Sequence, residues 1–159
     1  MAADKAGELR ARFTDALKAS MKAGDSARTS TLRMVTARLK DVDISARTRP
    51  DPAVSEGEIT SMLRGMVKSR RESVALYQQG GRAELADKEL AEIAVIESFL
   101  PAEMDEAALA AAVEEAVAAT GAALPKDMGR VMGALKARFG AELDMGRANP
   151  LVKARLTPG

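Results

Sequence analysis

The stretch Asp127-Met128-Gly129-Arg130-Val131-Met132-Gly133 is the most informative segment of this sequence, because it places two glycines four residues apart in an otherwise helical pattern. Glycine in a helix interior costs about 0.8–1.0 kcal/mol relative to alanine, so the repeat indicates that something approaches the backbone closely. At about 100° per residue, Gly129, Gly133 and Lys136 share one face of this helix. The neighbouring face carries the apolar side chains expected to pack inside the protein: Met128, Met132, Leu135 and Phe139.

The glycine face, defined by Gly129, Gly133 and Lys136, has two interpretations. Either another helix packs closely against it, or the sugar-phosphate backbone of a nucleic acid rests there. The second interpretation adds cations as phosphate contacts, namely Lys126, Arg130 and Lys136. It also uses the backbone amides near Asp127 and Met128 as donors, although the Asp127 carboxylate opposes anions at that point. The residues alone favour helix packing.

The composition predicts an all-α protein, and the length suits either one domain or two small helical lobes. Among 159 residues, 47% are apolar and 30% are charged, which is typical of a globular chain. Alanine, leucine, methionine, glutamate, lysine and arginine dominate over β-branched and aromatic residues, and this balance favours helices. Three phenylalanines and one tyrosine are too few for extensive stacking on single-stranded bases, so an RNA ligand would be recognised by its folded shape.

No catalytic, metal-binding or cofactor-binding residue is predicted. The absence of cysteine excludes disulfides and thiolate zinc sites, and the absence of histidine removes the usual general base and the commonest metal ligand. Serine and threonine therefore lack the usual partner that would activate them. The paired carboxylates lie on helix faces that the apolar periodicity assigns to solvent, namely Glu89 with Glu92, Asp105 with Glu106 and Glu114 with Glu115.

The apolar periodicity predicts a series of helices separated by glycine and proline. Their expected ranges are about 5–22, from 25 or 26 onward, 55–80, 83–100, 105–120, 127–140 and 144–156. The third begins with a capping box formed by Ser55 and Glu58, and Asp127 is expected to cap the glycine helix. The fourth is expected to bury Leu90, Ile93, Ile96 and Leu100. Pro150 predicts a kink or a late start in the last helix.

Pro101 cannot continue a helical hydrogen-bond ladder, so it marks the predicted boundary between an N-terminal helical domain (1–98) and a C-terminal helical domain (99–159). Charge is also divided along the chain. Residues 84–115 hold ten acids and one lysine, whereas 126–156 hold seven bases and three acids. Such blocks suit an anionic partner, but solvent-exposed helix faces give similar blocks.

The densest basic patch lies on the third predicted helix. Arg64, Lys68 and Arg71 are spaced there at i, i+4 and i+7, and Arg70 adds a fourth cation. One interpretation is an RNA contact. The favoured interpretation is a solvent-exposed face with local pairing to Glu72.

The sequence gives no sign of export or membrane insertion. Its first residues lack the apolar segment of a secretory signal, and it contains no uncharged apolar run of about 18 residues. A cytoplasmic protein is therefore expected.

Several short motifs occur in a characteristic order along the chain. They are Leu32-Arg33-Met34, Arg70-Arg71-Glu72-Ser73 with Tyr77, Glu89 to Glu92, Phe99-Leu100-Pro101 and, most specific, the stretch from Asp127 to Gly133. In their order and spacing over nearly the whole chain, these motifs resemble the GatB/YqeY family. Its stand-alone members are related to the tail of the B subunit of the glutamine-dependent aspartyl/glutamyl-tRNA amidotransferase.

The resemblance implies a helical N-terminal lobe followed by a small helical tail lobe, equivalent to the part of the amidotransferase thought to help hold the body of the tRNA. The kinase and transamidase sites of that enzyme are not in this sequence. Carbon–nitrogen ligase activity with glutamine as amido donor would therefore be inherited from the family name alone. The segment from Phe139 to Asp144 is more acidic than the turn expected of the family.

Three functions are consistent with these features. The first is a non-catalytic tRNA-binding or tRNA-metabolism accessory protein, with tRNA and possible amidotransferase or aminoacyl-tRNA machinery as partners. Its candidate nucleic-acid-binding residues are Lys126, Gly129, Arg130, Gly133, Lys136, Arg64, Lys68 and Arg71. The alternatives are a component of glutamine-dependent amidotransferase activity on mischarged tRNA, and a helical protein–protein adaptor that uses residues 84–115 or the basic third helix.

Overall fold

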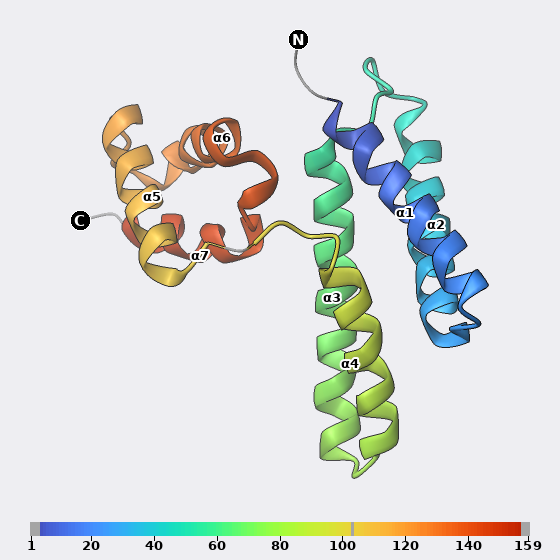
Figure 1. Ribbon diagram of the computed structural model, residues 1–159. Helices are drawn as coiled ribbons and strands as arrows, with labels where there is room; N and C mark the ends of the chain where they lie inside the picture. Colours follow the sequence, from blue (N-terminus) through green and yellow to red (C-terminus); the bar gives the residue numbers. More distant parts are fainter. Residues whose placement is uncertain (1–3, 103, 157–159) are drawn as a thin grey trace. The chain divides into compact units, whose positions relative to one another are not determined.

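The structure, a computed structural model, describes residues 4–102 and 104–156 and confirms the all-α prediction (Figure 1). Helices account for 80% of it, and no strand occurs among the described residues. The chain divides into two compact units, Met1–Leu100 and Pro101–Gly159. Each unit has a hydrophobic core of its own.

The first unit consists of two helical hairpins (Figure 1). Its helices are α1 (Lys5–Lys22), α2 (Ser26–Ala46), α3 (Glu56–Gln79) and α4 (Ala83–Glu97). Asp4, Asp25 and Ser55 precede the first three, and each side chain accepts a hydrogen bond from the backbone N–H three residues ahead. These caps satisfy donors that the first helical turn leaves unpaired, which fixes where each helix begins.

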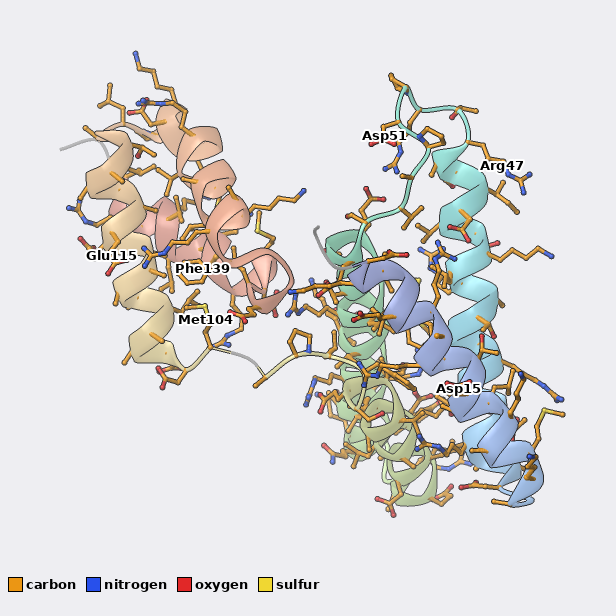
Figure 2. All side chains as sticks on the ribbon, turned by 45° about the horizontal axis from the view of Figure 1, so that its top comes forward. Asp15, Arg47, Asp51, Met104, Glu115 and Phe139 are labelled. Carbon is orange, nitrogen blue, oxygen red and sulfur yellow. The ribbon has the colours of Figure 1, made fainter. Side chains whose placement is uncertain are left out.

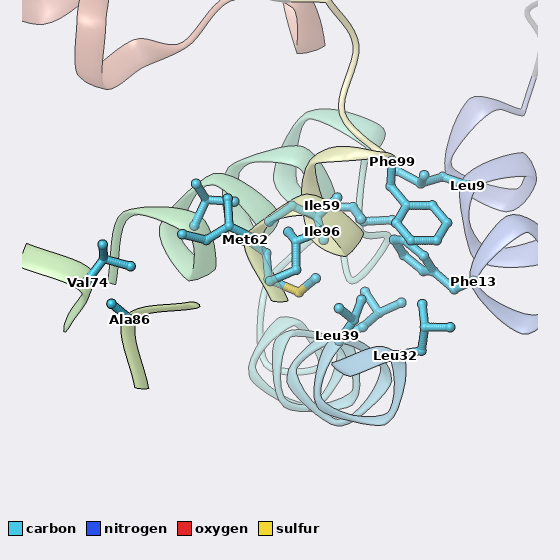
Figure 3. Close-up of a cluster of buried hydrophobic side chains, with 14 residues drawn as sticks. Leu9, Phe13, Leu32, Leu39, Ile59, Met62, Val74, Ala86, Ile96 and Phe99 are labelled. Carbon is cyan, nitrogen blue, oxygen red and sulfur yellow. The ribbon is translucent and has the colours of Figure 1, made fainter. Parts of the chain in front are cut away.

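The core of the first unit lies where the two hairpins meet (Figure 3). Leu32 and Leu39 of α2 point into this cluster, and Phe13 of α1 contacts Phe99 edge to face, with 4.8 Å between ring centroids. Fully burying one such side chain contributes about 1.5–3 kcal/mol. The hairpins are therefore held together mainly by apolar contacts supplied from all four helices.

The second unit is a smaller helical cluster. It contains α5 (Glu106–Thr120), the 3-10 turn η1 (Pro125–Asp127), α6 (Met128–Phe139), the 3-10 turn η2 (Gly140–Glu142) and α7 (Met145–Arg155). α5, α6 and α7 all contact one another. The buried residues of this unit include Leu109, Val113, Val117, Val131, Leu135, Leu143, Val152 and Leu156. The Ala-rich α5 packs closely because few of its side chains are bulky.

Two positions of α4 differ from the prediction. Leu90, expected to face inward, is 42% exposed. Glu92, expected to face solvent, has a side chain only 16% exposed, because it pairs at 3.0 Å with Arg70 of α3. The simple apolar period does not anticipate this ion pair, since its two members lie on different helices.

The last helix has the predicted range of about 144–156 but not the late start that Pro150 suggested. α7 begins at Met145, directly after its cap Asp144, so the expectation of a late start was wrong. Pro150 lies inside the helix and has no backbone N–H to donate to the preceding turn. The helix nevertheless continues to Arg155, with Ala148 and Val152 fully buried. Apolar burial on this side of α7 therefore offsets the missing hydrogen bond.

Candidate nucleic-acid interface

The glycine face of α6 lies on the surface of the second unit. Gly129, Gly133 and Lys136 are all exposed, whereas Val131 and Leu135 on the other side of the helix are buried. A Cβ atom added at either glycine would meet no described atom within 4 Å beyond its own helix. Within the described part of the second unit, no helix therefore crosses closely at this face, although such a crossing was the favoured interpretation from the residues alone.

The Asp127 side chain bonds backward along the chain. One carboxylate oxygen accepts the backbone N–H of Ala123 at 3.0 Å and of Leu124 at 3.1 Å, and the other accepts Arg130 Nη2 at 2.8 Å. The two backbone N–H groups, followed by the Arg130 guanidinium, hold the pKa of this carboxyl far below its usual value. The expectation that Asp127 caps α6 was wrong, because its side chain makes no cap bond to that helix.

Arg130 connects the start of α6 to the end of α5. Its Nη1 donates to the Thr120 carbonyl at 3.0 Å while its Nη2 donates to Asp127. The last carbonyls of a helix lack partners within the helix, and Arg130 supplies one. The guanidinium is thus already engaged in holding the turn between the two helices. To contact a phosphate it would have to share or leave these acceptors.

The backbone amides at the start of α6 are occupied as well. The Asp127 N–H donates to the Leu124 carbonyl at 2.8 Å, and the Met128 N–H donates to the Pro125 carbonyl. Both bonds belong to η1, which leads directly into α6. Neither of these two amides is therefore free to donate to an anion.

A sequence signal for this turn does exist, in the spacing of Leu124, Pro125 and Asp127. Proline is favoured at the first position of such a turn. An acid two residues after the proline can accept a hydrogen bond from the backbone N–H of the residue before the proline. The structure has this arrangement, since the Asp127 carboxylate accepts the Leu124 N–H.

The cations of the second unit fall into two groups. Arg138 pairs with Glu115 and lies 5.1 Å from the Phe139 ring centroid, and Arg155 pairs with Glu114; Figure 2 labels Glu115 and Phe139. By contrast, three exposed lysines of this unit form no ion pair within the described part of the chain: Lys126, Lys136 and Lys153. These lysines can approach an anion without losing an existing partner. Lys153, on α7, was not among the predicted contacts.

The basic patch of α3 is divided by ion pairs with α4. Arg70 pairs with Glu92, and Arg71 pairs with Glu97. The expected local pairing with Glu72 is thus replaced by pairing across the hairpin. Lys68 is exposed and has no ion pair among the described residues, whereas Arg64 is only partly exposed. The patch offers less available positive charge than its sequence suggests.

No group of three or more acidic, histidine or cysteine side chains in residues 4–102 and 104–156 is placed to hold a metal ion. Over the same residues, no single helix is long and apolar enough to cross a membrane. One pair of helices bent by 99°, Glu106–Thr120 with Pro125–Phe139, passes that test together by length and composition.

Comparison with known proteins identifies similar sequences. A family model described as Yqey-like protein matches residues 10–156. The chain is also similar to Altered inheritance of mitochondria protein 41, mitochondrial, from Eremothecium gossypii, with 32% identity over 130 residues. The similarity covers 77% of this chain and 66% of the relative, so the chain spans just under two thirds of that protein's length.

Proposed function

Since the chain belongs to the YqeY-like protein family, we propose that it is a non-catalytic accessory protein that binds tRNA through the glycine face of α6. The observation that carries this proposal is the exposure of Gly129 and Gly133 with no described atom near the place of a missing side chain. A helix that bears glycine at two exposed positions gives up stability there, and close approach of a ligand backbone is a physical reason for that cost.

The charges around the glycine face support a phosphate ligand. Lys136 lies on the face and Lys126 lies in η1, directly before α6, and both ammonium groups are without an ion pair in the described structure. Ammonium groups contact phosphates as mobile point charges, which position a nucleic acid without reading its sequence. Asp127 and Arg130 contribute indirectly, because their bonds to residues 120–124 hold the start of α6 in place.

Filter binding of the full chain to total tRNA, at about 50 mM and about 200 mM salt, tests the proposal. The binding constant should fall with salt at a slope of roughly −0.7 to −0.9 per phosphate contacted. The variant that combines Gly133→Asp with Lys136→Glu should lose most of the binding, because it puts negative charge at the contact surface.

The matched control is Ala37→Asp with Lys40→Glu. It makes the same change of charge at two exposed positions of α2, also three residues apart. Binding should be retained in this control. The proposal fails if the unmodified chain retains no tRNA at low salt, or if both double variants lose binding equally, since the loss would then reflect net charge alone.

The same preparation addresses amidotransferase activity. Incubated with mischarged tRNA and glutamine, the chain alone is expected to give no conversion of the aminoacyl group. Appearance of glutaminyl-tRNA or asparaginyl-tRNA would overturn the proposal that the protein is non-catalytic.

A further inference from the structure

A groove lies between α2 and α4 in the first unit, and its lining contains none of the residues used above for tRNA binding. Its volume is about 640 Å³. The apolar part of its lining comes from Ala27 and Met34 on α2 and from Ala91 and Val95 on α4. Arg28 and Lys88 line it from the same two helices. The groove therefore has an apolar floor and one cation on each side.

One of the two acids of the groove forms an ion pair, whereas neither of its cations does. The Asp25 carboxylate accepts the Arg28 backbone N–H at 3.1 Å as the cap of α2. Glu92 is paired with Arg70 at 3.0 Å. Within the described residues, the side chains of Arg28 and Lys88 take part in no ion pair. Among the lining residues without an ion pair, two cations outnumber one carboxylate, that of Asp25, so the net unpaired charge of the groove is positive and favours a negative ligand.

The four apolar residues of the lining, called the floor of the groove, suit a partner that lies close to the backbones of α2 and α4. Two of its four apolar residues are alanines, which leave room beside the backbone of α2 and α4. Met34 is 38% exposed, and the flexible, polarisable methionine side chain adapts to the shape of an apolar partner. The described lining residues include no aromatic side chain on which a base could stack. A protein segment is favoured over a nucleic acid for these reasons.

We propose that the groove between α2 and α4 binds an acidic amphipathic helix of a partner protein. Such a helix presents apolar residues at i, i+3 or i+4, and i+7, which would fill the alanine-lined floor. Acidic side chains on the two flanks of that stripe would meet Arg28 on one side and Lys88 on the other. This binding does not depend on the proposed tRNA function, because the two surfaces share no residue.

The test selects ligands from a displayed library of peptides about 16 residues long, the length at which isolated helices become stable. The library varies alanine, leucine, glutamate, lysine and glutamine, and the bait is the full chain. Retained peptides should show the helical apolar period together with net negative charge. Their affinity, measured by fluorescence anisotropy, should fall at least about tenfold for Arg28→Glu with Lys88→Glu.

Two further variants separate the groove from general charge and from folding. Lys18→Glu with Lys40→Glu reverses the same amount of charge at exposed positions outside the groove and should leave peptide affinity unchanged. Ala91→Gln places a larger neutral side chain on the exposed floor of the groove and should weaken binding with normal helicity. Gly133→Asp with Lys136→Glu should bind peptide normally, which distinguishes this proposal from the tRNA proposal.

Other outcomes would overturn the proposal. Retention of no peptide, of basic peptides, or of peptides without a helical period would exclude the proposed ligand. Equal loss of affinity in the groove variant and in the Lys18 and Lys40 control would show that net charge alone is responsible. Self-association of the chain that Arg28→Glu with Lys88→Glu abolishes would identify a second copy as the occupant instead.

Discussion

At the scale of single residues, Asp127 and Arg130 bind backward to the segment that precedes α6. Asp127 holds the backbone at Ala123 and Leu124, and Arg130 holds the Thr120 carbonyl. These two charged residues of the glycine-containing stretch therefore contribute to the turn between α5 and α6. A side chain at either exposed glycine would meet no described atom within 4 Å of its Cβ, so the charged residues and the glycines of this stretch can be varied separately.

Asp127→Asn should lower the thermal stability of the second unit at neutral pH, because the charged carboxylate accepts three hydrogen bonds. The folded-state pKa lies below the unfolded-state value, so the contribution is fully present above the unfolded pKa of about 4. It is lost as the pH falls from there toward the folded pKa. Melting followed by circular dichroism at about pH 7 and about pH 2 should show a difference between variant and parent that shrinks at low pH. Asp87→Asn, at an exposed acid of α4, is the control and should change little.

Gly133→Ala should raise the free energy of unfolding by about 0.4–1 kcal/mol, since the new Cβ meets open space in a helix interior. Gly121→Ala should lower it, because Gly121 ends α5 with φ of +67°, a conformation that alanine adopts only with strain. Urea unfolding measures both changes. If Gly133→Ala also weakens tRNA binding, then alanine at position 133 favours stability and glycine favours binding. Destabilisation by Gly133→Ala would mean that the position is not open.

At the scale of elements, the α3–α4 hairpin combines a partly buried ion pair with an exposed one. The Arg70 and Glu92 side chains are 15% and 16% exposed, and Arg70 also donates to the Met66 carbonyl at 3.2 Å. The Arg71 and Glu97 side chains are 60% and 43% exposed. Burial lowers the effective dielectric around the first pair, so it should contribute more to stability than the second.

Glu92→Gln should therefore destabilise the first unit by about 1–3 kcal/mol, because it leaves the Arg70 charge partly buried without its partner. Glu97→Gln is the matched control and should cost no more than about 1 kcal/mol. Chemical denaturation of both variants gives the comparison. Equal effects of the two substitutions would show that burial does not distinguish the pairs.

Helix caps and apolar stripes could be predicted from the sequence, because each depends on residues close together in one element. Ser55 caps its helix as its spacing indicates, and Asp105 caps α5 in the same way. The ion pairs between α3 and α4 and the backward bonds of Asp127 could not be predicted from single-helix periods. The groove between α2 and α4 also escaped prediction, since it is formed by residues of two helices that are far apart in the sequence. The residues of the glycine face were found by their helical spacing, and their role in binding stays a prediction.

At the scale of the whole molecule, each of the two units has its own core. The second unit, Pro101–Gly159, is small enough that the surface it buries gives only marginal stability. Single core residues should therefore matter more there than in the four-helix unit. Val131 and Leu135, which α6 contributes to this core, are 0% and 1% exposed.

Leu135→Ala should destabilise the second unit by about 2–5 kcal/mol through the lost apolar contacts and the cavity left behind. Hydrogen exchange followed by mass spectrometry should show faster exchange in α5, α6 and α7, with α1 to α4 unchanged. Leu63→Ala, at a fully buried position of α3, should give the reverse pattern. Faster exchange throughout the chain in either variant would show that the two units unfold as one.

The hydrogen bond from the Arg130 guanidinium to the Thr120 carbonyl also determines which positions of this segment can be substituted during evolution. Arg130 recognises a main-chain oxygen, which every amino acid supplies, so position 120 can accept other side chains without loss of the contact. Asp127 is recognised through its carboxylate and Arg130 through its guanidinium, so neither can be replaced alone without loss of a bond. Substitutions should therefore accumulate at position 120 in related sequences while positions 127 and 130 covary.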